Sequence, residues 1–152
     1  MKKIPALILS LVLLFALAAC GADDGASDGA QSWAKDWGIT LSVKEVSPTG
    51  LKLICTQRGG IAEGSLETGS EYRIEKYEND NWVEVKPQGD AVWDMMSHLI
   101  ASNAETEWEI DWSWLYGELS PGAYRICKTV VDFKDAGVSE SQVYCAEFEI
   151  KG

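Results

Sequence analysis

Residues 111–127 read DWSWLYGELSPGAYRIC, a stretch in which bulky aromatic side chains surround a turn signal. The turn signal is Ser-Pro-Gly at 120–122, because proline and glycine favour backbone angles that reverse a chain. Four aromatic residues flank it: Trp112, Trp114, Tyr116 and Tyr124. Because such side chains bury large areas, we expect this group mainly to close one end of a domain and not to form an exposed ligand platform.

Outside this stretch, short segments alternate between apolar and polar residues with the period of two that is typical of half-buried β-strands. Their apolar positions are Ile39, Leu41 and Val43; Leu51, Leu53 and Cys55; Tyr72 and Ile74; Trp108 and Ile110; Tyr124 and Ile126; and Ala146, Phe148 and Ile150. Turn residues at 47–50 and 78–81 separate neighbouring segments. Because no window longer than about ten residues has a helical period, we predict an all-β fold, an antiparallel β-sandwich of about seven strands in residues 37–152.

The position of Tyr124 indicates which class of β-sandwich the chain forms. In immunoglobulin-like sandwiches a tyrosine follows the turn between strands E and F, and its hydroxyl braces that turn by bonding to upstream backbone. Here strand E would end near Asp111, residues 112–116 would make one helical turn, and Tyr124 would open strand F. Antibody domains carry a cysteine two residues after this tyrosine, but Ile126 stands there. We therefore predict an immunoglobulin-like architecture without the antibody disulfide.

Several stretches resemble the bacterial immunoglobulin-like domain of Firmicutes lipoproteins, which also occurs as the extracellular tail of some membrane-embedded sensor metallopeptidases. The stretches that carry the resemblance are LSVKEVSPTGL at 41–51, YRIEKY at 72–77, WVEV at 82–85, EIDW at 109–112, LYGEL at 115–119 and PGAYRI at 121–126. The resemblance covers residues 39–151 and implies a β-sandwich with no known catalytic residues. It implies no particular ligand.

The first 36 residues have a different character. Two lysines precede an apolar run that ends in Leu-Ala-Ala-Cys at 17–20, which is the layout of a bacterial lipoprotein signal. In such signals the cysteine sulfur takes a diacylglycerol, and the peptide is cut just before it. We predict a signal peptide at 1–19, lipidation of Cys20 and a flexible tether over 20–36. An uncleaved anchor helix, or an ordinary signal with a chance cysteine, is the alternative.

The chain is acidic, with a formal net charge of −11 at pH 7. An acidic surface disfavours binding to nucleic acid and docking on anionic lipid headgroups. We therefore expect the lipid on Cys20 to hold the protein at the extracytoplasmic face of the cell membrane. Its further partner is expected to be an unidentified protein or glycan.

Three cysteines remain after lipidation of the fourth. Cys127 and Cys145 lie on the predicted strands F and G, which should be antiparallel neighbours joined by a loop from about residue 133 to 142. The alternation places both cysteines on the outer face, where they could form a cross-strand disulfide; a reducing habitat would leave them free. Cys55 is expected to be a small buried side chain in the core.

The sequence offers little for catalysis. His98 is the only histidine, and no serine lies in a nucleophile-elbow motif. One histidine does not build a typical catalytic zinc site. The alternating carboxylates Glu107, Glu109 and Asp111 belong on a solvated strand face. We predict that the protein is not an enzyme and has no metal site and no cofactor.

The leading functional hypothesis is a non-catalytic binding or accessory module, since immunoglobulin-like sandwiches bind through end loops or exposed strand edges. Segment 86–106, which contains Trp93 and His98, has the least regular pattern and is the best candidate for a ligand surface. Its alternative interpretation is an irregular edge strand whose apolar side chains cover the sandwich. The residues that would do so are Val92, Met96 and Ile100.

Two other hypotheses remain open. Carbohydrate recognition would use exposed Trp93, Trp112 or Trp114 as stacking platforms. A sensory or inhibitory partner of a membrane peptidase is suggested only by analogy with the tail domains named above. The exposure of Trp112 and Trp114 separates the carbohydrate hypothesis from a purely structural role for these side chains.

Overall fold

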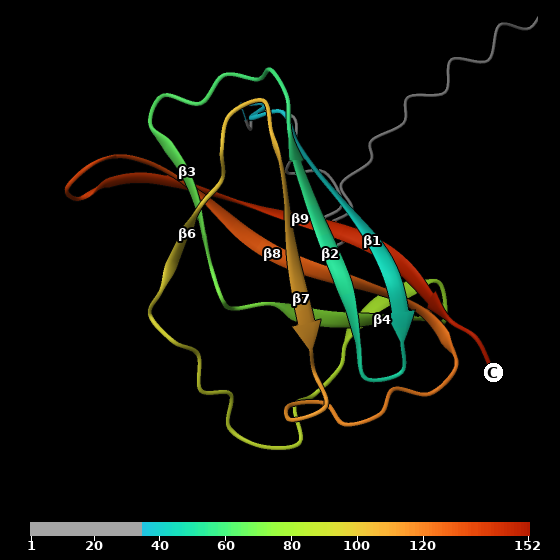
Figure 1. The fold of residues 1–152 in the computed structure, drawn as a ribbon. Coiled ribbons are helices and arrows are strands. Elements are labelled where there is room, and N and C mark those ends of the chain that lie inside the picture. Colours follow the sequence, from blue (N-terminus) through green and yellow to red (C-terminus); the bar gives the residue numbers. More distant parts are fainter. Residues whose placement is uncertain (1–34) are drawn as a thin grey trace, which may run out of the picture. The chain divides into compact units, whose positions relative to one another are not determined.

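The computed structural model describes residues 35–152, which form nine β-strands in two antiparallel sheets (Figure 1). The strands are β1 (Ile39–Ser47), β2 (Gly50–Gln57), β3 (Ser65–Gly69), β4 (Arg73–Glu78), β5 (Asn81–Glu84), β6 (Ser97–Leu99), β7 (Glu105–Asp111), β8 (Gly122–Asp135) and β9 (Val138–Ile150). One sheet has the order β1-β2-β7. The other has the order β5-β4-β8-β3-β6, with β9 paired to β8. The predicted all-β antiparallel sandwich is confirmed, with nine strands in place of about seven.

Tight turns join neighbouring strands where the sequence predicts them. The turn between β1 and β2 pairs Ser47 with Gly50, and the Ser47 hydroxyl donates to the Gly50 carbonyl at 2.9 Å. The turn between β4 and β5 has φ angles of 51° at Asn79 and 63° at Asp80. Two positive φ angles are typical of the hairpin turn whose twist matches that of the strands, and Asn and Asp adopt them more readily than other non-glycine residues.

Strands β8 and β9 form one long hairpin, so the predicted loop at 133–142 is wrong. β8 continues to Asp135, and β9 begins at Val138. The stretch SESQ at 139–142 has no apolar residue, yet it pairs with β8 along its whole length. The hydrogen bonds between strands join backbone groups. A stretch of polar residues can therefore be part of a strand even though its side chains lack the alternating pattern that predicts one.

Two clusters of buried side chains fill the space between the sheets. β8 contributes to both, because its alternate residues point inward. Its side chains Tyr124 and Ile126 belong to the larger cluster, and Val130 belongs to the smaller one. Cys55 is buried in the smaller cluster, beside Trp37.

One end of the larger cluster is closed by aromatic side chains from the stretch 111–127. Trp112 is fully buried, and its indole N–H donates to the Pro48 carbonyl at 2.8 Å. The Tyr124 hydroxyl donates to the Ser120 carbonyl at 2.8 Å, which ties β8 to the turn before it. Both rings stack on Phe148, with centroids 5.6 and 5.7 Å away. Backbone hydrogen bonds from Leu115 and Tyr116 to the Trp112 carbonyl form the helical turn between them.

The cysteines Cys127 and Cys145 stand directly opposite each other on β8 and β9 and are joined by a disulfide. Cys145 is exposed, as expected for the outer face. Cys127 was expected to face outward as well, but its side chain is only 1% exposed. Its sulfur is bonded to Cys145, and the residue lines a pocket together with Arg73, Pro87 and Ala91.

The predictions for the amino-terminal segment lie outside the described residues. They are the signal peptide at 1–19, the lipidated Cys20 and the tether at 20–36, of which only residues 35 and 36 are described. Within residues 35–152, no helix has the length and apolar character needed to cross a membrane.

Removal of the hydrogen bond between the Tyr124 hydroxyl and the Ser120 carbonyl is expected to destabilise the domain. Tyr124→Phe keeps the ring stacked on Phe148 but removes the part-buried hydrogen bond to the Ser120 carbonyl. We expect the free energy of unfolding to fall by about 1–2 kcal/mol, measured by urea denaturation.

The matched control is Tyr77→Phe. The Tyr77 ring is 45% exposed, and its hydroxyl has no hydrogen-bond partner within residues 35–152. This variant is expected to unfold like the original protein. Equal behaviour of the two variants would show that the Tyr124 hydroxyl does not brace the turn.

Candidate functional site

A pocket of about 500 Å³ opens between β7 and the segment 92–98, which runs from an irregular stretch into β6. Its aromatic walls come from β7 and from three connections between strands. The residues that supply them are Tyr72, Trp93, Trp108 and Trp114. Its polar groups are Ser70, Asp94, His98 and Lys128, together with carboxylates of β7. We call this the tryptophan pocket, since three of the seven tryptophans of the chain line it.

The aromatic rings of this pocket contact one another in series. Trp93 meets Tyr72 edge-on, with centroids 4.9 Å apart, and meets Trp114 edge-on at 5.4 Å. Tyr72 is buried, whereas Trp114 is 54% exposed. The series therefore runs from the core to the surface. Such edge-to-face contacts hold each ring in a defined orientation before any ligand arrives.

The structure brings together three of the four predicted ligand residues. Trp93, His98 and Trp114 line the tryptophan pocket. Trp112 does not, because its side chain points into the core and is fully buried. The helical turn explains the difference: residues 112, 115 and 116 face the interior, and residue 114 faces out. Trp112 is therefore a structural side chain and no longer a candidate for ligand contact.

Segment 86–106 does not cover the sandwich in the way that its alternative interpretation predicts. Ile100 is buried, but Val92 is 80% exposed and Met96 is 60% exposed. Only the last part of the segment is regular, with β6 and the first residues of β7. Residues 92–94 instead form one wall of the tryptophan pocket, where Asp94 accepts a hydrogen bond from Ser70.

Lys128 at the pocket floor was not predicted from the sequence. It occupies an inward position of β8, in phase with Tyr124 and Ile126, and is only 4% exposed. At this point β8 changes partner, from β4 up to Cys127 to β3 from Val130. The Lys128 ammonium group donates to the Gly69 carbonyl at 2.7 Å and to the Glu71 carbonyl at 3.1 Å, in the crossing between those strands.

Burial changes the pKa of two groups in this region. Loss of solvent lowers the pKa of Lys128 from 10.5 to about 8. Burial raises the pKa of the Cys55 thiol to about 11, with a smaller opposing effect of the Lys128 charge. At neutral pH the lysine is charged and the thiol is protonated. An ammonium group has three donors, so two carbonyl contacts leave Lys128 one N–H for other partners. Its nitrogen also lies 5.6 Å from the centroid of the Trp108 ring.

The rim of the tryptophan pocket is acidic. The hydrogen bond from the Ser70 hydroxyl holds the pKa of Asp94 below its usual value, and that from the Ser113 hydroxyl does the same for Asp111. Glu107 and Glu109 also border the pocket. The lining of the pocket therefore includes four carboxylate residues and one buried ammonium group, so its rim favours ligands with positive charge.

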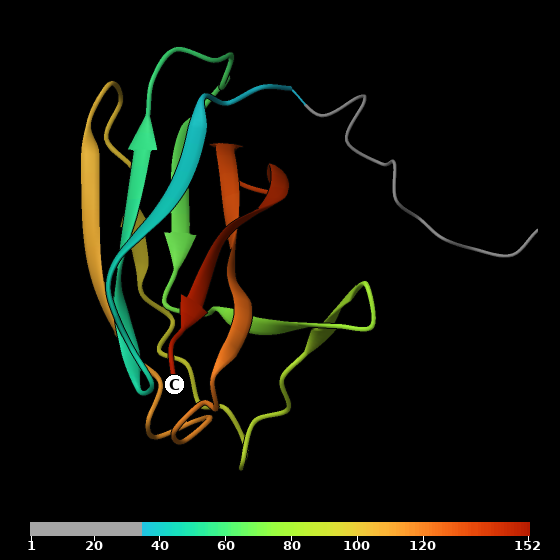
Figure 2. The ribbon, with the colours of Figure 1, turned by 90° about the vertical axis from the view of Figure 1, so that its right-hand side faces the viewer.

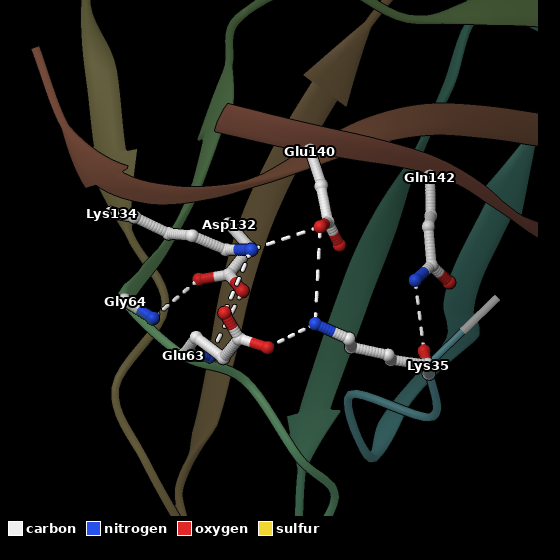
Figure 3. Close-up of polar contacts among 7 residues, drawn as sticks. All are labelled: Lys35, Glu63, Gly64, Asp132, Lys134, Glu140 and Gln142. Atoms are coloured by element: carbon white, nitrogen blue, oxygen red, sulfur yellow. Dashed lines mark hydrogen bonds and ion pairs between the residues drawn. The ribbon is translucent and has the colours of Figure 1, made fainter. Parts of the chain in front are cut away.

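A second polar cluster lies near the start of the described chain (Figure 3). Buried Asp132 accepts hydrogen bonds from the backbone N–H of Glu63 at 2.9 Å and of Gly64 at 2.7 Å. The Glu63 carboxylate pairs with Lys35 and Lys134, and these contacts lower its pKa to about 2. Every charge in this cluster has a partner, so we interpret it as a structural clamp that holds the β2–β3 connection against β8. No group of three or more metal-ligating side chains occurs in the described part of the chain.

A comparison with protein-family models matches residues 35–149 to the bacterial Ig-like domain. The chain belongs to this family. The predicted immunoglobulin-like resemblance is thereby confirmed over nearly the whole described domain. Domains of this family are typically extracellular and generally non-catalytic, and they serve as accessory or binding modules. No curated protein and no solved structure matches the chain.

The lowered pKa of Lys128 predicts a pH-dependent stability. Between about pH 8 and 10.5 the unfolded chain binds the proton that the folded domain has released. The contribution of Lys128 to the free energy of unfolding should therefore rise across this interval, by about 2–3 kcal/mol. Cys55 acts in the opposite direction above its ordinary pKa of 9.0, because its folded-state pKa is raised.

We measure the free energy of unfolding of the original protein and of Lys128→Met by urea denaturation. The value for the original protein minus the value for the variant is expected to increase from pH 8 to 10.5. Subtracting the variant removes most of the Cys55 contribution, which both proteins share. A difference that stays constant with pH would mean that Lys128 titrates normally in the folded domain.

Proposed function

We propose that this protein is a lipid-anchored, extracytoplasmic binding module that performs no chemistry of its own and whose ligand occupies the tryptophan pocket. Membership of the bacterial Ig-like family supports an accessory or binding role. The sequence Leu-Ala-Ala-Cys at 17–20, after a basic start and an apolar run, supports the anchor.

One observation carries the proposal for the pocket. Within a single helical turn the aromatic side chains Trp112 and Tyr116 are buried, yet Trp114 is more than half exposed beside Trp93. Exposed tryptophan is costly to hydrate, and rings already fixed by neighbouring rings lose little freedom when they bind. An apolar pocket with a few converging polar groups is the usual form of a ligand site.

Glycan binding is a second candidate. It is favoured by the position of Trp114, which is more than half exposed and lines the same pocket as the polar residues Ser70 and Asp94. Sugars commonly need such a combination, because their apolar faces stack on rings while their hydroxyl groups require hydrogen-bond partners. The third candidate, a sensory or inhibitory partner of a membrane peptidase, stays a hypothesis that rests on the resemblance alone.

The pocket predicts that Trp114 is needed for binding but not for folding. Intrinsic tryptophan fluorescence is followed while the protein is titrated with soluble cell-wall glycan fragments and with short cationic peptides. We expect a saturable shift in emission with one of these ligand classes, and an affinity at least about tenfold lower in Trp114→Ala.

The matched control is Trp82→Ala, which removes a partly exposed tryptophan on β5 that does not line the pocket. It should bind like the original protein. Equal losses in the two variants, or binding that neither affects, would place the ligand elsewhere on the domain.

If the protein is lipid-anchored, its association with the membrane depends on the sulfur atom of Cys20. In bacteria that express the full chain, the protein should be recovered with the membrane fraction and should incorporate labelled palmitate. Cys20→Ser removes the only atom that could carry the diacylglycerol in such a signal, so both properties should be lost. Membrane association of Cys20→Ser without label would indicate an uncleaved anchor helix instead.

A further inference from the structure

We propose that the ligand is an extended peptide with alternating basic and apolar side chains, which adds a strand to the free edge of β7 and lies along the tryptophan pocket. This inference deepens the proposed function and rests on it, because the added strand would occupy the same pocket. It follows from four properties of β7: its free edge, the direction of its backbone groups, the space beside it and its charge.

The first property is that β7 has a strand on one side only. It pairs with β2 along its seven residues, and no strand of the described chain pairs with its other side. Figure 2 shows β7 at the margin of its sheet, with β2 next to it. An edge of this length presents a row of unpaired N–H and C=O groups, which can accept a further strand.

The second property is the direction of the backbone groups. In an antiparallel pair, alternate residues exchange hydrogen bonds with the partner, and those between them point away. The backbone N–H of Trp112 donates to the Thr49 carbonyl, and the backbone N–H of Gln57 donates to the Ala104 carbonyl. Residues 104 and 112 flank β7 and are both even-numbered, so the even-numbered residues of β7 form the backbone hydrogen bonds to β2. The N–H and C=O groups of Glu105, Glu107 and Glu109 therefore point to the free edge.

The third property is space. Residues 107–111 of β7 all line the tryptophan pocket, which means that the cavity of about 500 Å³ runs along this edge. A paired strand lies about 4.8 Å from its neighbour. The far wall of the pocket is the irregular segment 92–94, which is not paired in a sheet. The Tyr72 hydroxyl contacts the Asp111 carbonyl and marks the inner limit of the available edge.

The fourth property is charge. Glu105, Glu107 and Glu109 are exposed on the outer face of β7, and Trp108 and Ile110 lie half-buried on its inner face. Glu107 is 3.7 Å from Lys44, while Glu105 and Glu109 have no ion-pair partner within residues 35–152. Opposite charges on facing strands attract, and apolar side chains pack on the inner face. The complementary strand therefore carries Lys or Arg on alternate residues and apolar side chains between them.

The same charge disfavours a second copy of this chain as the occupant. If two β7 edges paired, their outer faces would bring glutamate against glutamate. Like charges directly opposite on neighbouring strands are destabilising, and charged edge residues are a common protection against self-pairing.

The experiment measures binding of a synthetic peptide as long as β7 that alternates lysine and valine. The full chain is purified in mild detergent, and affinity is measured by isothermal titration calorimetry. Two further peptides carry backbone N-methyl groups, on the lysines in one and on the valines in the other. In an antiparallel added strand the lysine N–H groups point to β7, and the valine N–H groups point away. We expect methylated lysines to weaken binding at least about tenfold and methylated valines to leave it nearly unchanged.

The protein side of the interaction is tested with Glu107→Pro. Proline removes the N–H that points to the free edge and keeps the pairing with β2, a position where strands accept proline. We expect at least about a tenfold loss of peptide affinity, with a thermal unfolding midpoint close to that of the original protein. Glu107→Gln is the control for charge, since it keeps the N–H. Its loss of affinity should be smaller and should disappear at high salt.

Equal effects of the two methylated peptides, or no effect of either, would overturn strand addition even if Glu107→Pro did not fold. Peptide binding that depends on Trp114 but not on the β7 backbone would do the same and would leave the tryptophan pocket as the ligand site. Failure of the peptide to bind, with a glycan binding in the Trp114-dependent titration, would overturn this inference and keep the proposed function. Failure of both ligand classes would overturn both.

Discussion

The arrangement of this domain depends on the packing and hydrogen bonding of the buried Trp112 indole. Its side chain bonds to Pro48 in the β1–β2 turn and stacks on Phe148 of β9, so it links the two sheets at one end. Its backbone carbonyl starts the helical turn. Because the Trp112 side chain points into the core, the side chain two positions later in the same helical turn, that of Trp114, points outward. The exposure of Trp114, and with it the place of this ring in the lining of the tryptophan pocket, is a consequence of the same contact.

Much of the fold could be predicted from the sequence, since period-two alternation and the Pro-Gly turn before Tyr124 are local signals of a sandwich. The elements that escaped prediction have weak side-chain patterns. β3 and β6 are short, and the polar stretch at 139–142 is held in β9 by backbone pairing with β8. Pairing of this kind depends on a partner far away in the sequence, which a local pattern does not reveal.

The candidate site was predictable in part. Trp93, His98 and Trp114 meet in one pocket, as their grouping as ligand residues suggested, but Trp112 could be excluded only from the phase of the helical turn. Lys128 was missed because a lysine in an alternating segment is normally assigned to the solvent face. It is buried because β8 changes partner beside it, where carbonyl groups of the crossing segment need donors.

The central position of β8 also bears on when this chain can fold. β8 pairs with β3, β4 and β9, yet it begins only at Gly122. The larger sheet therefore has no centre until most of the chain has been synthesised. Folds dominated by contacts between distant segments form slowly, because the loops between them must close first. Late arrival of the central strand therefore delays formation of the larger sheet until segments far apart in the sequence are all available to pair.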